Sequence, residues 1–88
     1  MFLHLGNDVS VRTRDIIAIY DYVGFFVKDN PDNKRYFARC KAEGKVWRTT
    51  ASMDLVKSIV ITKDRIYLSG IFTLALKNRT RAIYDMGK

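Results

Sequence analysis

The chain has 88 residues, of which 48% are hydrophobic, so it is long enough for one small domain and too apolar to be disordered. Sixteen lysines and arginines against nine acidic residues give a net charge of +7, which favours an anionic partner, either nucleic acid or an anionic membrane surface. Nucleic acid is the more usual partner of a small basic domain. The single cysteine excludes a disulfide framework and a cysteine-based metal site.

The N-terminal sequence MFLHLG lacks the basic and long apolar regions of a secretory signal. No apolar run approaches the roughly 18 residues that a membrane-spanning helix needs. We therefore expect a cytoplasmic protein without a membrane partner.

The first predicted element is a β-hairpin. Residues 2–5 and 9–12 are predicted to be its two strands, because Gly6 and Asn7 between them form a pair typical of tight hairpin turns.

The segment RTRDIIAIYD, residues 12–21, alternates with the period of two that is typical of a strand. We predict one strand here, with residues 14–20 either extending or following the second strand of the hairpin. Arg12 and Arg14 then share one face at the rim of the sheet, directly before its apolar residues. Such a pair suits an edge that binds a polyanion, and it equally suits an ordinary solvated strand end. The similar segment RTRAIYD at residues 79–85 is interpreted as coincidence or as a basic tail, because two short echoes do not make a repeat.

Residues 23–27 form a short apolar run that we predict to be a strand. A helix is predicted over residues 31–43, because Asp29 or Asn30 can cap it, Pro31 suits its first position and Gly44 suits its C-terminal end. The apolar stripe of this helix consists of Tyr36, Phe37 and Cys40, and its basic face of Lys34, Arg35, Arg39 and Lys41.

In the C-terminal half, residues 45–50 are predicted to form a strand, and residues 58–62 and 65–69 a hairpin rich in β-branched and aromatic side chains. Residues 72–78 suit a short helix that packs Phe72, Leu76 and Ala75. The predicted fold class is α+β, with a small, mainly antiparallel sheet, one central amphipathic helix and a short C-terminal helix. Residues 1–78 form a single domain in this prediction, and residues 79–88 form a basic C-terminal tail.

No arrangement of residues in the sequence supports catalysis. His4 has no nucleophile or orienting carboxylate nearby in the sequence, and Cys40 suits a small core residue, with a reactive thiol as the alternative. The glycines are scattered and form no phosphate-binding loop, and the aspartates show no metal-loop spacing. We therefore expect no enzyme, no cofactor, no metal and no small-molecule substrate.

The basic residues remain, since phosphate contacts need lysine or arginine. The basic face of the predicted helix is a further candidate for phosphate contacts, although solvation is the more usual reason for charge on an exposed helix face. Tyr20, Tyr22 and Trp47 suit either stacking on bases or packing in the core. The residues that we predict to contact nucleic acid are Arg12, Arg14, Arg48 and Lys57.

The string HLGNDVSVRTRDIIAIYD closely resembles the start of the RemA/RemB family of extracellular matrix regulatory proteins, and its opening hairpin is most similar to the RemB type. The similarity returns in VKSIVITKDRIYLSGI, residues 56–71. The resemblance implies a transcriptional regulator of biofilm-matrix genes, with a subunit similar to the LytTR class of DNA-binding domains. It also implies a homo-oligomeric ring, for which eight is one candidate number of subunits, around which double-stranded DNA bends.

The resemblance places the DNA-contacting arginine of the family at Arg14. It also implies a pair of arginines before the later apolar strand, where this chain has Asp54, Leu55, Val56 and Lys57, so that only Lys57 is basic. This departure leaves two other functions open: a ring-forming interaction module that does not touch DNA, and a single-stranded RNA binder.

A small core in a strand-rich chain is expected to leave an apolar surface that a second copy covers. Our candidates are Val23, Phe25, Phe26 and Val27, together with Tyr67 or Phe72. The alternative is that the helix over residues 31–43 covers this surface within one subunit, which would leave a monomer.

Overall fold

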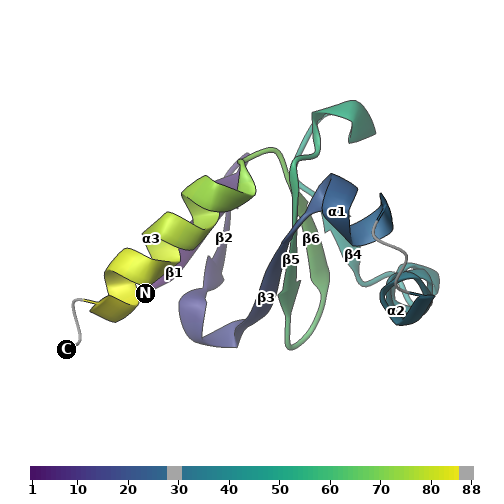
Figure 1. Cartoon of the computed structure of the whole chain (residues 1–88), viewed down its shortest axis with the longest axis horizontal. Helices are drawn as coiled ribbons and strands as arrows, with labels where there is room; N and C mark the ends of the chain where they lie inside the picture. The colour runs from purple at the N-terminus through teal and green to yellow at the C-terminus, as the bar shows by residue number, and fades with distance from the viewer. Residues whose placement is uncertain (28–30, 86–88) are drawn as a thin grey trace.

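A computed structural model of the chain describes residues 1–27 and 31–85. The elements in these residues are β1 (Phe2–Gly6), β2 (Val9–Arg12), the 3₁₀ turn η1 (Thr13–Asp15), β3 (Ile16–Asp21), α1 (Tyr22–Val27), α2 (Pro31–Ala42), β4 (Val46–Arg48), the 3₁₀ turn η2 (Met53–Leu55), β5 (Ser58–Thr62), β6 (Ile66–Ser69) and α3 (Thr73–Asp85). They form three layers (Figure 1). The middle layer is a four-stranded sheet in the order β3–β5–β6–β4, with α1 and α2 on one face and the β1–β2 hairpin and α3 on the other. The predicted α+β class is confirmed, and the likeness to LytTR domains stays a prediction.

The first hairpin forms as predicted. Its strands pair antiparallel, with Leu3 opposite Val11, and the turn residues Asn7 and Asp8 have φ angles of 50° and 63°. Two consecutive positive φ angles are the geometry of the turn whose twist matches that of a hairpin. Leu3 and Leu5 are buried against the middle sheet and Leu76 of α3, so the hairpin closes one side of the core.

The prediction of one strand over residues 12–21 is wrong. Strand β2 ends at Arg12, η1 follows, and β3 begins at Ile16. The chain leaves the hairpin at Thr13, whose backbone N–H donates to the carbonyl oxygen of Met1 at 3.0 Å. The period-two pattern persists through this turn because it holds in each strand separately, and it therefore hides the break between them.

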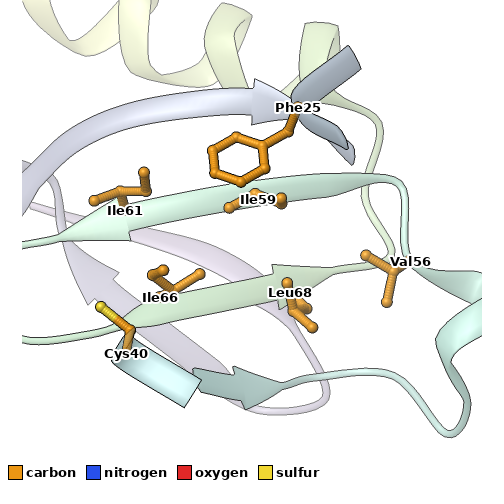
Figure 2. Packing of buried hydrophobic residues seen from close by; sticks show 7 residues of the cluster. All are labelled: Phe25, Cys40, Val56, Ile59, Ile61, Ile66 and Leu68. Carbon is orange, nitrogen blue, oxygen red and sulfur yellow. The ribbon is translucent and has the colours of Figure 1, made fainter. Parts of the chain in front are cut away.

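The prediction of a strand over residues 23–27 is also wrong, because this segment lies in α1. The carboxylate of Asp21 accepts a hydrogen bond from the backbone N–H of Gly24 at 3.2 Å, which caps the start of the helix. The helix buries Phe25, which lies over Ile59 of β5 (Figure 2).

Helix α2 begins at Pro31 and ends at Ala42, which confirms the predicted helix to within one residue at its C-terminal end. Gly44 follows with a φ of 71°, the left-handed conformation expected of it. The predicted caps Asp29 and Asn30 lie outside the described residues. The predicted apolar stripe is confirmed, since Tyr36, Phe37 and Cys40 all pack on the core, with Cys40 beside Ile66 (Figure 2).

The second hairpin, β5–β6, is confirmed, and all five residues of β5 are buried. Strand β4 is shorter than predicted and joins β6 in parallel. Thr49 follows β4, and Ser69 is the last residue of β6. Their hydroxyl groups both donate to the carbonyl oxygen of Leu5, at 3.2 and 2.7 Å. These two bonds tie the first hairpin to the middle sheet.

Helix α3 runs to Asp85 and is longer than the predicted residues 72–78. Leu76 is buried and Ala75 is partly buried, as expected, but Phe72 is 66% exposed. The prediction that Phe72 packs in the core is wrong because the helix begins only at Thr73, and Phe72 lies before its first turn. The division into a domain of residues 1–78 and a tail of residues 79–88 stays a prediction.

Candidate nucleic-acid interface

Thr13 anchors the turn that carries the two predicted arginines. It is buried, and its hydroxyl donates to the carbonyl oxygen of Met1 at 3.3 Å in addition to the bond from its backbone N–H. Arg12 and Arg14 stand on either side of it, and both are exposed. The threonine between the arginines thus fixes the backbone while its two neighbours project into solvent.

Neither of these arginines makes an ion pair with any residue in the ranges 1–27 and 31–85. Together with Met1, Phe2 and Thr13 they line a shallow depression of about 350 Å³. Their guanidinium groups are therefore available to an anion from solution.

The structure does not bring the four predicted residues together. Arg12 and Arg14 lie beside the start of β3, whereas Arg48 ends β4 and Lys57 precedes β5 at the opposite end of the sheet. Lys63 at the β5–β6 turn is six positions after Lys57 along the extended chain of β5, a distance of roughly 20 Å at about 3.3 Å per residue.

Two further basic residues lie at the same end as Arg12 and Arg14. Lys63 and Arg65 belong to the turn between β5 and β6, where the backbone N–H of Lys63 donates to the carbonyl oxygen of Asp15 at 3.1 Å. We call the four residues at this end, Arg12, Arg14, Lys63 and Arg65, the arginine edge.

Acidic residues partly offset the charge near the arginine edge. The ammonium group of Lys63 lies 3.8 Å from the Asp15 carboxylate, and Asp64 and Asp15 line a neighbouring groove with Arg12. Lys45, also nearby, pairs with Glu43 at 2.9 Å, and the hydrogen bond and charge of Lys45 lower the pKa of Glu43. Arg12, Arg14 and Arg65 are the basic residues here whose charge no described carboxylate neutralises.

Arg65 lies against two aromatic rings. Its guanidinium carbon is 3.8 Å from the centroid of the Trp47 ring and 6.0 Å from that of Tyr67. Sequence analysis missed Lys63 and Arg65, because their place beside Arg12 depends on how distant strands pair. The one local signal was that Arg65 and Tyr67 are two residues apart on the same face of a predicted strand.

The opposite end of the sheet is less suited to binding an anion. The guanidinium group of Arg48 donates to the backbone carbonyl oxygens of Thr50 and Ala51, at 3.0 and 3.2 Å, and thereby holds its own loop. Lys57 lies over the ring of Phe72, 5.9 Å from its centroid.

Asp54 adds a negative charge at this opposite end. Its carboxylate accepts a short hydrogen bond from the hydroxyl of Ser52, which lowers the pKa of Asp54 and keeps it ionised. It occupies part of the place where the resemblance implies a pair of arginines.

The tyrosines predicted as base-stacking candidates pack on core aromatic rings. The ring of Tyr20 lies 5.4 Å from that of Phe25, and the ring of Tyr22 lies 5.1 Å from that of Phe26. Trp47 remains half exposed at the middle position of β4, opposite Tyr67.

A metal site, a reactive side chain and a membrane-spanning helix are three further features that the described residues could contain. Among residues 1–27 and 31–85, no group of three or more His, Cys, Asp or Glu side chains is placed to bind a metal ion. His4 is exposed on β1, and Cys40 is buried in the core. None of the helices in the described ranges has the length and apolar composition needed to span a bilayer.

Comparison with known proteins agrees with the resemblance seen in the sequence. A family model described as RemA-like, extracellular matrix regulatory protein A-like, matches residues 2–80. The chain is also 33% identical over 86 residues to extracellular matrix regulatory protein B of Bacillus subtilis (strain 168), a match that covers 98% of each protein. The chain therefore belongs to the RemA-like family of extracellular matrix regulatory proteins.

Proposed function

We propose that the protein regulates the transcription of extracellular-matrix (biofilm) genes by binding the backbone of double-stranded DNA through the arginine edge. The observation that carries this proposal is the pair Arg12 and Arg14, which are exposed and unpaired on a turn that buried Thr13 anchors. Membership of a regulatory family and a net charge of +7 support it. A regulator of this kind acts in the cytoplasm, where the DNA is, and needs no enzymatic activity.

In this proposal the two ends of the sheet contribute unequally to DNA binding. Arg12 and Arg14 supply the main phosphate contacts, because each is exposed and neither holds another part of the chain. Arg48 and Lys57 supply secondary contacts, because Arg48 already binds its own loop and Asp54 lies near Lys57 in the chain. Arg14→Ala should therefore weaken DNA binding more than Lys57→Ala, which removes one positive charge at the other end.

The active form in our proposal is a closed homo-oligomeric ring, which gathers the charge of every subunit into one positive belt and bends DNA by many weak phosphate contacts. Exposed apolar side chains support association, among them Phe2, Ile17, Val23 and Phe72, each more than 60% exposed. Phe25 and Phe26, two of our candidates for the contact, are covered within the subunit by each other and by Phe37 of α2. The side chain of Val27 lies outside the described part of the chain.

Light scattering behind a sizing column tests the ring. A particle several times the 10.2 kDa mass of one chain is expected. A strict monomer at tens of micromolar protein would contradict the ring and remove most of the case for DNA bending.

The second candidate function is a ring-forming interaction module without DNA contact. It is favoured by the end of the sheet that carries Asp54, where Met53 and Leu55 are 42% and 49% exposed and Asp54 and Leu55 stand in the place of the implied arginines. Apolar side chains beside an ionised carboxylate suit a protein partner better than a phosphate.

One binding experiment separates these functions. Labelled duplex DNA, single-stranded RNA and an uncharged polymer are each titrated with the protein at near-physiological salt. Our proposal predicts binding to duplex DNA above the other two. Binding to none of them would favour the interaction module, and preference for single-stranded RNA would favour base stacking on exposed rings.

A further inference from the structure

The parallel pairing of β4 with β6 builds a stacked arrangement at the arginine edge. It sets Trp47 opposite Tyr67, and the two rings meet at 6.2 Å in an edge-to-face geometry. Arg65 is two residues before Tyr67 in the chain, and its guanidinium group lies over the indole ring, 3.8 Å from the centroid. Trp47, which is half exposed on the edge strand β4, therefore has the guanidinium group of Arg65 packed over its ring.

The stack of Arg65, Trp47 and Tyr67 is not part of the hydrophobic core. Trp47 is half exposed and belongs to neither buried cluster, and Tyr67 contacts the core only at its margin. Among the residues that the structure describes, the guanidinium group of Arg65 makes no hydrogen bond and no ion pair. Its five N–H donors are therefore unused by the protein itself.

Stacking prepares a guanidinium group for one kind of ligand. With its central carbon 3.8 Å from the indole centroid, the group is restricted in where it can lie, and the N–H donors at its rim, which bond to no described residue, stay available to a ligand. Two parallel N–H groups at such a rim match two oxygens of a phosphate, a geometry that a lysine ammonium group does not offer.

The stack lies next to the arginines of the proposed DNA contact. Tyr67, Arg12 and Phe2 line one groove of about 180 Å³, so the stack adjoins the surface of Arg12 through Tyr67. Asp15 and Asp64 also line this groove and oppose an anion there, and Lys63 lies 3.8 Å from the Asp15 carboxylate and offsets it.

We propose that Arg65, held in place on Trp47, is the bidentate phosphate-binding residue of the arginine edge. The proposal rests on the DNA binding proposed above and names a contact of that same site. Trp47 acts in it as a support for the guanidinium group and does not stack on bases.

Trp47 is the only tryptophan of the chain, so its fluorescence reports on the stack directly. A duplex labelled at one end gives the binding curve by anisotropy, and Trp47 emission is followed in the same titration. We expect the emission to change with the same midpoint as the anisotropy. A saturated anisotropy signal with unchanged Trp47 emission would overturn the proposed contact and leave DNA binding intact.

The variant Arg65→Lys separates geometry from charge. It keeps the positive charge but loses the planar fork, so we expect the affinity for duplex DNA to fall roughly tenfold, the effect of one charge-assisted bidentate contact. The slope of affinity against salt should stay unchanged, because no charge is removed. The matched control is Arg35→Lys on α2, where Arg35 pairs with Asp32 at 2.8 Å, and we expect its affinity to stay within about twofold of the unaltered protein.

The remaining outcomes are equally decisive. Equal affinity of the Arg65→Lys protein and the unaltered protein would refute the bidentate contact alone, and absence of DNA binding by the unaltered protein would refute both this contact and the proposed function. Larger changes of Trp47 emission with single-stranded than with duplex DNA, at equal saturation, would assign the ring to base stacking and refute its supporting role. Melting curves of both lysine variants confirm that the comparison is made on folded protein.

Discussion

Thr13 explains why the sequence places two arginines only two residues apart. Thr13, the central residue of the RTR segment, is the one that stabilises the fold. It is buried, and its N–H and its hydroxyl both donate to the carbonyl oxygen of Met1. The flanking Arg12 and Arg14 are exposed by the same turn. The second RTR segment, at residues 79–81, lies within α3, so the same three letters have a different local structure there.

Replacing Thr13 by valine tests this anchor. The change keeps the shape and the net charge but removes the hydroxyl bond to Met1, which should lower the free energy of unfolding by about 1 kcal/mol. Because the turn then holds the arginines less firmly, the affinity for duplex DNA should fall several-fold. Thr13→Ser keeps the hydroxyl and should restore both quantities, and a valine variant with full affinity would show that the anchor is irrelevant to binding.

Gly70 lies close to the loop that contains Thr50 and Leu55, and a residue without a side chain permits this close approach. A Cβ atom at this position would lie 2.9 Å from Cγ2 of Thr50 and 3.4 Å from the carbonyl oxygen of Leu55. Gly70→Ala should therefore lower the free energy of unfolding by roughly 1–3 kcal/mol, as overpacking does.

The Thr50→Ser change removes the obstructing methyl group and keeps the hydroxyl that bonds to the carbonyl oxygen of Ser52 at 2.7 Å. In a double-mutant cycle followed by urea unfolding, it should recover part of the loss caused by Gly70→Ala. Strictly additive effects would mean that the contact with Thr50 is not the cause.

Helices and strands could be predicted from the sequence wherever nearby residues marked both of their ends. Both hairpins and α2 were predicted, because turn residues, Pro31 and Gly44 mark their ends. Residues 23–27 were not, because five apolar residues fit a strand and a helix equally well, and the deciding signal was the cap at Asp21, one element earlier. Arg12 and Arg14 were identified by their spacing, whereas Arg65 reaches Trp47 only through the non-local pairing of β4 with β6.

Helix α1 is held to the sheet by one side chain in particular. Phe25 is 3% exposed and contacts the rings of Tyr20, Phe26 and Phe37. Phe25→Ala should lower the free energy of unfolding by about 3–5 kcal/mol. Lys41→Ala, an exposed position on α2, should change it by less than about 0.5 kcal/mol. Both are measured by urea unfolding at one protein concentration, and equal losses would contradict the assignment of α1 as a helix with Phe25 inside.

For the whole molecule, the arrangement of charge matters more than its amount. Basic residues lie at both ends of the sheet and on α2 and α3. The arginine edge combines guanidinium groups that pair with no described carboxylate and a turn that buried Thr13 anchors. The opposite end combines Arg48 and Lys57 with an ionised Asp54 and exposed apolar side chains. We infer that the main DNA contacts lie at the arginine edge of each subunit, which a ring would repeat around its circumference, and that Arg48 and Lys57 add only the secondary contacts.

The measurement that tests this account most directly is the salt dependence of duplex DNA binding, compared between the unaltered protein and Arg14→Ala. Each phosphate that the protein neutralises contributes about −0.9 to the slope of log affinity against log salt concentration. We predict a steep negative slope for the unaltered protein and, for Arg14→Ala, weaker binding with a slope shallower by about 0.9 for each copy of Arg14 that contacts a phosphate. Binding that is insensitive to salt, or a slope and affinity unchanged by the substitution, would contradict the proposal that the arginine edge binds the DNA backbone.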